Sequence, residues 1–377
     1  MSGSFLIAAR RSPVVPRNGT FAHLSIEALA KPVLSAALKD AKIAPDQVGE
    51  IINANSLGAG GNPARIIALN AELPNRVAGL TIDRQCAGGL DAILLADAMI
   101  QSGHHQIVVV GGVESYSRRP LRYHTFPDGR EPLPYEQAKF TPWADRDPDM
   151  AQAADNLARE LEISRSEQDA WAVTSHKKAM AARSKKLPSN VVGMGGITED
   201  AFTRNLTSRL TDRASVISGS ITAANMSVAA DGAALIVMAS RQFVEEKNID
   251  GVEFVSGATV GGDPELPGIA PVEAIGNALT VAGISIDDLT CAEVMEAFAV
   301  QAIACQRGAK LPISIVNRRG GSLARGHPIS ASGAILVVNL FNELLENPGI
   351  GLAAIAAAGG LGSAAVFRSS SSRKVWG

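Results

Sequence analysis

The sequence contains little of what marks several specialised classes of protein. Only three of its 377 residues are cysteines; this small, odd number argues against a disulfide framework and favours a reducing compartment. The net charge of −2 arises from interspersed acidic and basic residues, which excludes a basic stripe for nucleic acid and a polybasic patch for membranes. Aromatic residues make up only 4%. The composition therefore gives no sign of a nucleic-acid or membrane partner.

Long apolar runs are also missing. No stretch reaches the length needed to span a bilayer, and the apolar run at residues 4–9 is too short for a signal peptide. We therefore expect a soluble, cytoplasmic protein that does not act at membranes. With 46% apolar residues, the chain can bury an ample core, and its length favours two or three domains.

Apolar periodicity predicts alternating strands and helices in the first part of the chain. The predicted buried strand 107–110 ends at Gly111 and Gly112. Such alternation indicates an α/β layered domain with a largely parallel sheet. The other predicted elements are strands 4–9 and 50–55 and helices 25–41, 63–72 and 88–102.

From residue 116 to about 215 the sequence becomes polar and rich in proline. We expect an inserted segment packed on the core, with helices at 151–161 and 165–184, because Trp143, Met150 and Trp171 supply apolar surface to bury. The alternation resumes with a strand at 233–239.

The late part of the chain repeats the early part. The stretch from Cys86 through a long helix to Gly111-Gly112 has a counterpart in a helix from Ser330 to about 346 and a strand 352–358 that ends at Gly359-Gly360. This repeat predicts a pseudo-twofold core in which the first residues of both helices face one cleft.

Cys86 is the candidate nucleophile. It lies where a loop enters a helix, and a helix N-terminus favours thiolate over thiol, so we expect an acidic, reactive cysteine. His327 lies in a glycine-framed turn just before the second helix and could take the thiol proton. The other reading of Cys86, a small buried apolar residue, stays open at this point.

The sequence resembles the thiolase family of acyl-CoA acyltransferases along nearly its whole length. The resemblance implies an α/β thiolase fold: two pseudo-twofold-related α/β/α core domains, formed by residues 1–115 plus 231–251 and by 252–377, and an inserted loop domain at 116–230. The stretches that carry it are residues 8–13, 61–65, 83–90, 111–117, 166–170, 231–234 and 326–334.

The resemblance also implies a chemistry. Cys86 would form an acyl-enzyme, His327 would activate the thiol, and the N–H groups of Cys86 and Ala358 would stabilise the oxyanion. Ser227, Met150 and Phe298 match residues near the substrate, although a capping or core role stays open for each. A coenzyme A thioester would be the substrate, with no metal and no covalently bound cofactor. The family further implies a homodimer or homotetramer and a role in fatty acid metabolism.

The sequence departs from the family at two positions that matter for catalysis. Met295 replaces an asparagine that helps to hold a water in the oxyanion hole, and Ala356 replaces the second catalytic cysteine. Ala358 lies where the family has a glycine, and Asp149 lies where the family has a histidine. Neither Cys291 nor Cys305 fills the gap by alignment, and we expect both to be inert core residues.

These departures leave three hypotheses. The protein makes or cleaves 3-oxoacyl-CoA with another group as the base; or it loads an acyl group on Cys86 and passes it to water or another acceptor; or it is a non-catalytic CoA-ester binding protein. Arg319 and Arg325, close to His327 in sequence, could bind an acidic acyl group or a CoA phosphate. Alternatively they turn outward or pair with carboxylates of the core.

Overall fold

The computed structural model describes residues 3–58, 60–185 and 190–369. Within these residues, a single ten-stranded sheet forms the centre of the molecule. Its strand order is β12 (Cys291–Val294), β13 (Ile350–Ala357), β14 (Leu361–Arg368), β11 (Val252–Gly261), β1 (Ser4–Arg11), β10 (Ala230–Ser240), β5 (Ile107–Ser115), β3 (Glu50–Ala54) and β4 (Ala78–Ile82), while β2 (Val15–Pro16) pairs with β10.

The sheet has a mirrored strand order about the contact between β1 and β11. From that contact, β10, β5 and β3 follow on one side, and β14, β13 and β12 follow on the other. The pairs β3–β5 and β12–β13 are both parallel, whereas the pairs nearer the centre are antiparallel. The predicted repeat is therefore confirmed, but the prediction of a largely parallel sheet is wrong.

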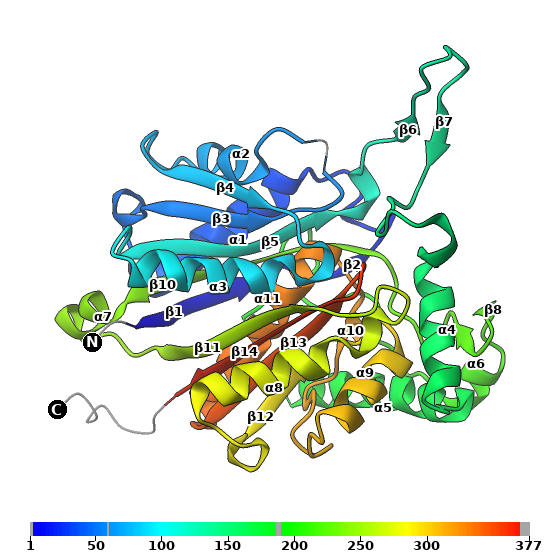
Figure 1. Cartoon of the computed structure of the whole chain (residues 1–377). Helices are drawn as coiled ribbons and strands as arrows, with labels where there is room; N and C mark the ends of the chain where they lie inside the picture. The colour runs from blue at the N-terminus through cyan, green and yellow to red at the C-terminus, as the bar shows by residue number, and fades with distance from the viewer. Residues whose placement is uncertain (1–2, 59, 186–189, 370–377) are drawn as a thin grey trace.

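Helical layers alternate with the two halves of this sheet, so that the molecule has five layers (Figure 1). The middle layer is α3 (Gly88–Gln101) and α11 (Ser332–Glu346), whose apolar residues share one core cluster with inward-facing residues of both halves, such as Val108 and Ile355. The outer layers are α1 (Ile26–Ala41) and α2 (Pro63–Asn70) on one half, and α8 (Pro271–Ala282) and α9 (Ala299–Gly308) on the other.

The two central helices approach closely because glycines line their contact. A Cβ on Gly89 would lie 2.7 Å from the carbonyl oxygen of Ser330, and a Cβ on Gly333 would lie 2.5 Å from the backbone nitrogen of Leu90. Both distances are below van der Waals contact, so only glycine lets the starts of α3 and α11 meet. This contact brings together the segments that carry Cys86 and His327.

One helical stretch of the described chain, Ile329–Glu346, is long and apolar enough to cross a membrane, contrary to the expectation from sequence. It comprises α11 and the turn before it, and 83% of it is buried inside the protein. Its apolar character is explained by its place between the two halves of the sheet.

The strand β5 does not end at Gly111 and Gly112 as predicted but continues to Ser115. A Cβ on Gly111 would lie 2.0 Å from the Ala234 oxygen, and one on Gly112 would lie 2.3 Å from the Ser330 oxygen. These glycines therefore allow close packing inside a strand rather than ending it.

Residues 116–230 pack against the core mainly through helices. The indole nitrogen of Trp171 donates to the Glu296 carboxylate at 3.1 Å, whereas Trp143, which we expected to be buried, is 51% exposed. A hairpin of β6 (Arg122–His124) and β7 (Leu133–Tyr135) extends away from the body (Figure 1). The division into domains at residues 115, 230 and 251 stays a prediction. The elements here are α4 (Met150–Glu160), α5 (Arg165–Ser184), α6 (Ser208–Asp212), β6 (Arg122–His124), β7 (Leu133–Tyr135), β8 (Val216–Ser218) and β9 (Ile221–Thr222); α7 (Arg241–Lys247) and α10 (Ser322–Arg325) complete the helices.

Candidate active site

Cys86 lies in a short 3-10 turn, Gln85–Ala87, that leads directly into α3. The turn opens with Gln85 at a φ of +49°, a left-handed conformation that costs energy for a non-glycine residue. The Asp83 carboxylate holds this conformation by accepting a hydrogen bond from the Gln85 N–H at 2.9 Å. The Cys86 thiol is partly exposed, while Ala87 is buried.

His327 faces this thiol from the other half of the molecule. Its Nε2 lies 3.1 Å from Cys86 Sγ, and its Nδ1 lies 2.6 Å from the Ser332 hydroxyl. The backbone of His327 is fixed as well, because its N–H donates to the Val228 oxygen at 2.8 Å. The Cys86 thiol therefore contacts a base, and the base contacts a group that orients it, which is the arrangement of an activated nucleophile.

Burial decides the charge state of this pair. It raises the pKa of Cys86 to about 12, with smaller contributions from the carboxylates of Glu114 and Asp83, and it lowers the pKa of His327 to about 4. The desolvation of the thiolate costs more free energy here than the backbone N–H groups at the helix start provide by stabilising it. Burial therefore opposes the acidic thiol that the helix start favours, and with these pKa values the pair is a thiol and a neutral imidazole at neutral pH. With the proton on sulfur, Nε2 accepts it and Nδ1–H donates to Ser332.

A buried carboxylate links the loop after β3 to the turn before α11. Glu114, 1% exposed, accepts hydrogen bonds from the Ser330 hydroxyl at 2.8 Å and the Asn55 amide at 2.9 Å, and from the Ser56 and Leu57 N–H groups. Burial raises the pKa of Glu114 to about 7. Because Ser330 lies in the turn Ile329–Ala331 before α11 and Asn55 follows β3, Glu114 connects both halves of the repeat.

Cys86 and His327 open into a cavity of about 260 Å³. All three predicted substrate-binding residues line it: Met150 from the start of α4, Phe298 from the start of α9, and Ser227. The Ser227 hydroxyl donates a hydrogen bond to the backbone carbonyl oxygen of Glu296 at 2.5 Å. Toward a substrate, this hydroxyl can therefore act only as an acceptor. Ala356 and Ala358, at the end of β13, line the same cavity. The predicted site residues are thus brought together on one largely apolar surface.

Comparison with known proteins identifies this arrangement. The sequence matches the thiolase N-terminal domain over residues 4–242 and the thiolase C-terminal domain over residues 251–369. The chain belongs to the thiolase family.

Relatives of this thiolase share its full length. A Bacillus subtilis protein with the provisional name acetyl-CoA C-acetyltransferase YhfS is 37% identical over 96% of this chain and 98% of its own. A Staphylococcus aureus protein, provisionally named acetyl-CoA C-acetyltransferase VraB, is 36% identical over 97% of this chain and 99% of its own. The crystal structure of Acat5 thiolase from Ascaris suum in complex with coenzyme A has a TM-score of 0.91 and 30% identity, covering 98% of this chain and all of that one.

Met295, the first departure of this thiolase, is excluded from the cavity. Its side chain is fully buried in the central core, where its sulfur accepts a hydrogen bond from the Ser322 hydroxyl at 3.2 Å. It is not among the described residues that line the cavity. A thioether turned away from the site cannot hold a catalytic water there.

Ala356, the second departure, does line the cavity, and neither remaining cysteine of this thiolase replaces it. Cys291 and Cys305 are 3% and 0% exposed, belong to core clusters, and have pKa values raised to about 12 by burial. Both are the inert core residues that the sequence predicts. The thiolase therefore has one cysteine at its cavity within the described chain.

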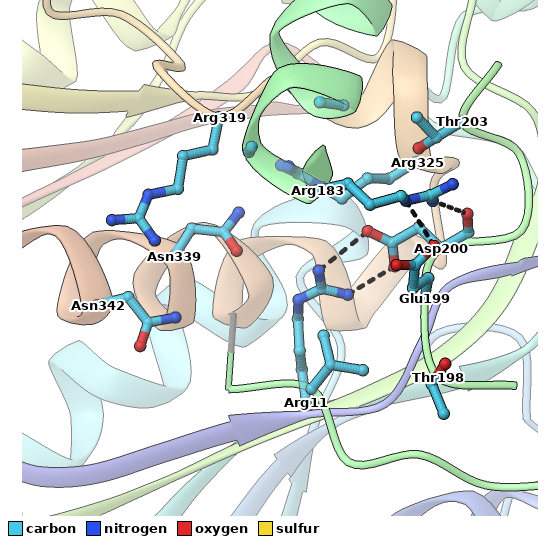
Figure 2. Close-up of a pocket in the computed structure, with 13 residues that line it drawn as sticks. Arg11, Arg183, Thr198, Glu199, Asp200, Thr203, Arg319, Arg325, Asn339 and Asn342 are labelled. Atoms are coloured by element: carbon cyan, nitrogen blue, oxygen red, sulfur yellow. Dashed lines mark hydrogen bonds and ion pairs between the residues drawn. The ribbon is translucent and has the colours of Figure 1, made fainter. Parts of the chain in front are cut away.

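Arg319 and Arg325 do not reach the Cys86 cavity, so the hypothesis that they bind an acyl group there is wrong. Arg319 pairs with Glu343 at 3.0 Å and Glu346 at 2.8 Å, and Arg325 lies 3.8 Å from Glu293. The alternative, pairing with core carboxylates, is correct. Both arginines line a second cavity of this thiolase, shown in Figure 2.

Sequence reasoning missed three contributors to the site. Ser332 and Glu114 lie inside the recognised motifs, but only the fold shows that Ser332 orients His327 and that Glu114 links the loop after β3 to the turn before α11. Tyr116 lines the cavity and, among the described lining residues, is the one titratable side chain besides Cys86 and His327. The guanidinium carbons of Arg17 and Arg119 lie 5.3 Å and 4.7 Å from the centre of its ring.

Proposed function

We propose that this thiolase is an acyl-CoA C-acyltransferase that forms an acyl-enzyme on Cys86. The observation that carries the proposal is the 3.1 Å contact between Cys86 Sγ and His327 Nε2 at the wall of an apolar cavity. A coenzyme A thioester is the proposed substrate, since a homologous thiolase crystallised with coenzyme A. The acyl group would occupy the cavity beside Met150 and Phe298.

The groups at the site account for every bond and proton in the acylation step. As Cys86 Sγ attacks the thioester carbonyl, its proton passes to His327 Nε2, so that no free thiolate has to exist in the buried site. The oxyanion would accept hydrogen bonds from the N–H groups of Cys86 and Ala358. The C–S bond to coenzyme A then breaks, and the leaving sulfur takes the proton from His327. Acyl-Cys86 and coenzyme A are the products.

The second half-reaction has fewer groups to support it. Carbon–carbon bond formation or cleavage needs a second acid-base group, and Ala356 cannot transfer a proton. We propose transfer to or from a 3-oxoacyl-CoA as the main function, because the acyl-loading residues are complete. The alternative is transfer to water or another acceptor, and the specific observation in its favour is that Ala356 lines the cavity.

Intact-protein mass spectrometry after incubation with acetyl-CoA tests the proposal. We expect an added acetyl group on the wild type, none on Cys86→Ser, and at least a hundred-fold slower loading of His327→Ala, because general-base catalysis contributes about 10²–10⁴-fold. A wild type that binds coenzyme A in calorimetry but forms no adduct would instead support the non-catalytic binding protein.

Cys86-dependent turnover of acetoacetyl-CoA and longer 3-oxoacyl-CoA with coenzyme A separates the two enzyme functions. Turnover supports the 3-oxoacyl-CoA reaction. An adduct that disappears in water without coenzyme A and gives no such turnover supports transfer to another acceptor.

We further propose a homodimer or homotetramer located in the cytoplasm and serving fatty acid metabolism. The support for association is the projecting β6–β7 hairpin (Figure 1), where Leu121, Tyr123 and Leu133 are 82%, 50% and 55% exposed, since clustered exposed apolar residues mark interaction surfaces. Light scattering of the wild type and of Leu121→Asp with Leu133→Asp measures the mass. A monomeric wild type would contradict the proposal.

A further inference from the structure

Tyr116 lies at the Cys86 cavity, at the point where β5 ends. It opens the 3-10 turn Tyr116–Arg118 and lines the cavity together with Cys86 and His327. Ala356, which lies where the family has its second cysteine, lines the same cavity. The described lining therefore has no second thiol for the carbon–carbon step, but it does contain a phenol.

The other polar groups of this lining do not offer a proton to a substrate. They are two amides and a serine hydroxyl, at Gln85, Gln301 and Ser227. Amide side chains are not acids or bases near neutral pH, and the Ser227 hydroxyl already donates its hydrogen to the backbone oxygen of Glu296. A tyrosine hydroxyl, in contrast, is one of the groups that act as general acids and bases in enzymes.

The sheet places Tyr116 close to the catalytic base. Ser115, the last residue of β5, pairs with Asp231 of the antiparallel strand β10. Ala229, two residues before Asp231, forms a backbone bridge with His327 and also lines the cavity. Since the strands are antiparallel, Tyr116 and Ala229 continue from the Ser115–Asp231 pair in the same direction. The tyrosine and the segment that holds His327 therefore meet at one end of the sheet.

The turn and the ring of Tyr116 are held without use of its hydroxyl. The buried Asp231 carboxylate accepts hydrogen bonds from the Ser117 N–H at 2.9 Å and from the Ser117 hydroxyl at 2.6 Å. The guanidinium groups of Arg17 and Arg119 lie over the ring, a contact that the aromatic face makes. In the described structure the Tyr116 hydroxyl has no hydrogen-bond partner. It is therefore available to a substrate in the cavity.

We propose that Tyr116 is the acid-base residue of the carbon–carbon step, in place of the cysteine that Ala356 replaces. The inference rests on the proposed acyl-transfer function and names the group that completes its second half-reaction. Tyr116 would be a catalytic residue, because its hydroxyl gives a proton to the substrate carbon and takes one from coenzyme A.

In the cleavage direction, Cys86 Sγ attacks the C3 carbonyl of a 3-oxoacyl-CoA while its proton passes to His327. The bond between C2 and C3 then breaks, and its electron pair moves to C2, which takes the proton of the Tyr116 hydroxyl. This half-reaction leaves acyl-Cys86, acetyl-CoA, a Tyr116 phenolate and a protonated His327.

The arrival of coenzyme A restores both groups. The Tyr116 phenolate takes the proton of the coenzyme A thiol, and the resulting thiolate attacks the carbonyl of acyl-Cys86. As the bond between this carbonyl and Cys86 Sγ breaks, Sγ takes the proton from His327. An acyl-CoA leaves, and all three side chains return to their starting states.

Tyr116→Phe tests the proposal, because phenylalanine keeps the ring and its contacts and removes only the hydroxyl. The readouts are turnover of the 3-oxoacyl-CoA that the wild type cleaves fastest and, separately, acetyl loading on Cys86 by intact-protein mass spectrometry. We expect turnover to fall at least a hundred-fold, since a general acid-base group contributes about 10²–10⁴-fold. Loading should stay within twofold, which also shows that the variant is folded.

The matched control is Tyr135→Phe. Its ring also contacts a neighbour, stacking on His124 at 4.2 Å between ring centres, but Tyr135 does not line the Cys86 cavity. Both readouts should stay within twofold of the wild type. A rescue variant combines Tyr116→Phe with Ala356→Cys. Its turnover should be at least tenfold higher than that of Tyr116→Phe alone, because the new thiol supplies a proton that phenylalanine cannot.

The outcomes separate this inference from the proposed function. If the wild type forms the adduct and cleaves 3-oxoacyl-CoA, but Tyr116→Phe cleaves it equally fast, only the role of Tyr116 is overturned. Equal losses of loading and turnover, or no gain from the added thiol, would show a structural role and overturn it too. A wild type that forms the adduct without cleaving any 3-oxoacyl-CoA overturns the inference and leaves acyl loading standing. A wild type that forms no adduct overturns both.

Discussion

Burial controls the reactivity of Cys86 in this thiolase. Buried charges are costly, and the pKa values of about 12 for Cys86 and about 4 for His327 keep both groups neutral over the whole range between them. In the proposed reaction, the nucleophile would therefore be made at the moment of attack, by proton transfer across the 3.1 Å between Cys86 Sγ and His327 Nε2. A substrate that excludes water from the cavity would strengthen this coupling.

We expect ultraviolet titration to detect no thiolate at Cys86 between about pH 5 and pH 9. The physical reason is that both pKa values lie outside this range, with the thiol above it and the imidazole below it. The measurement is the difference in thiolate absorbance between the wild type and Cys86→Ser. An absorbance step within this range, lost in His327→Ala, would show an ion pair and contradict the neutral state.

Ala356 gives a second prediction for a single residue. Ala356→Cys would place a thiol on the cavity wall where the thiolase family has its second cysteine, and Ala356 is 9% exposed there. We expect turnover of acetoacetyl-CoA to rise at least tenfold, since a general acid-base group contributes about 10²–10⁴-fold, while acetyl loading on Cys86 stays unchanged. Ala356→Ser is the control for size. Equal turnover in the two variants would mean that another step limits the reaction.

At the level of elements, the contact between α3 and α11 positions the chemistry. Gly333→Ala would put a Cβ 2.5 Å from the Leu90 nitrogen, so the helices would have to separate. We expect a loss of about 1–3 kcal/mol in the free energy of unfolding, as for other overpacked cores, together with slower loading of Cys86, because Ser332 beside Gly333 orients His327. Denaturant unfolding and the adduct assay measure the two effects.

The control for this prediction lies on α8. Gly276 is an exposed helical glycine whose Cβ would meet nothing within 4 Å. Gly276→Ala should therefore raise the free energy of unfolding by up to about 1 kcal/mol, because alanine is the better helix former, without changing activity. If both variants lose stability equally, the close helix contact is not the cause.

At the scale of the whole molecule, His176 links stability to pH. It is 1% exposed, its Nδ1 accepts from the Arg204 N–H at 3.3 Å, and its Nε2 has no partner in the described structure. Burial lowers the pKa of His176 to about 4 from 6.5. Between these values the unfolded chain binds the proton and the folded chain does not, so stability falls as pH falls from 6.5 toward 4.

We expect the wild type to lose about 2 kcal/mol more stability than His176→Gln between about pH 7 and pH 4.5, since one pKa unit is worth about 1.4 kcal/mol. Urea unfolding at the two pH values measures this difference. The buried carboxylates Glu114 and Glu293 titrate in both proteins, so their effects cancel. An exposed control, His104→Gln, should match the wild type. A loss in His176→Gln as large as in the wild type would contradict the assignment.

The sequence by itself determined the repeat, the family and the absence of a cysteine at position 356, and it singled out Cys86 and His327 as the candidate nucleophile and base. These follow from local patterns: glycines at helix starts, apolar periodicity and short motifs whose residues are close in the chain. The change of composition after residue 115 also predicts an inserted segment, and its bounds stay a prediction.

Only the tertiary structure decided the charge state of the Cys86–His327 pair, the direction of the strands, the burial of Met295 and the place of Arg319 and Arg325. Each depends on groups far apart in sequence: Cys86 packs against a core cluster drawn from both halves of the molecule, and Ser332 and Glu114 acquire their roles only when the turn before α11 meets the first half. Local sequence records which groups are present, whereas burial and charge pairing are set by what the fold places around them.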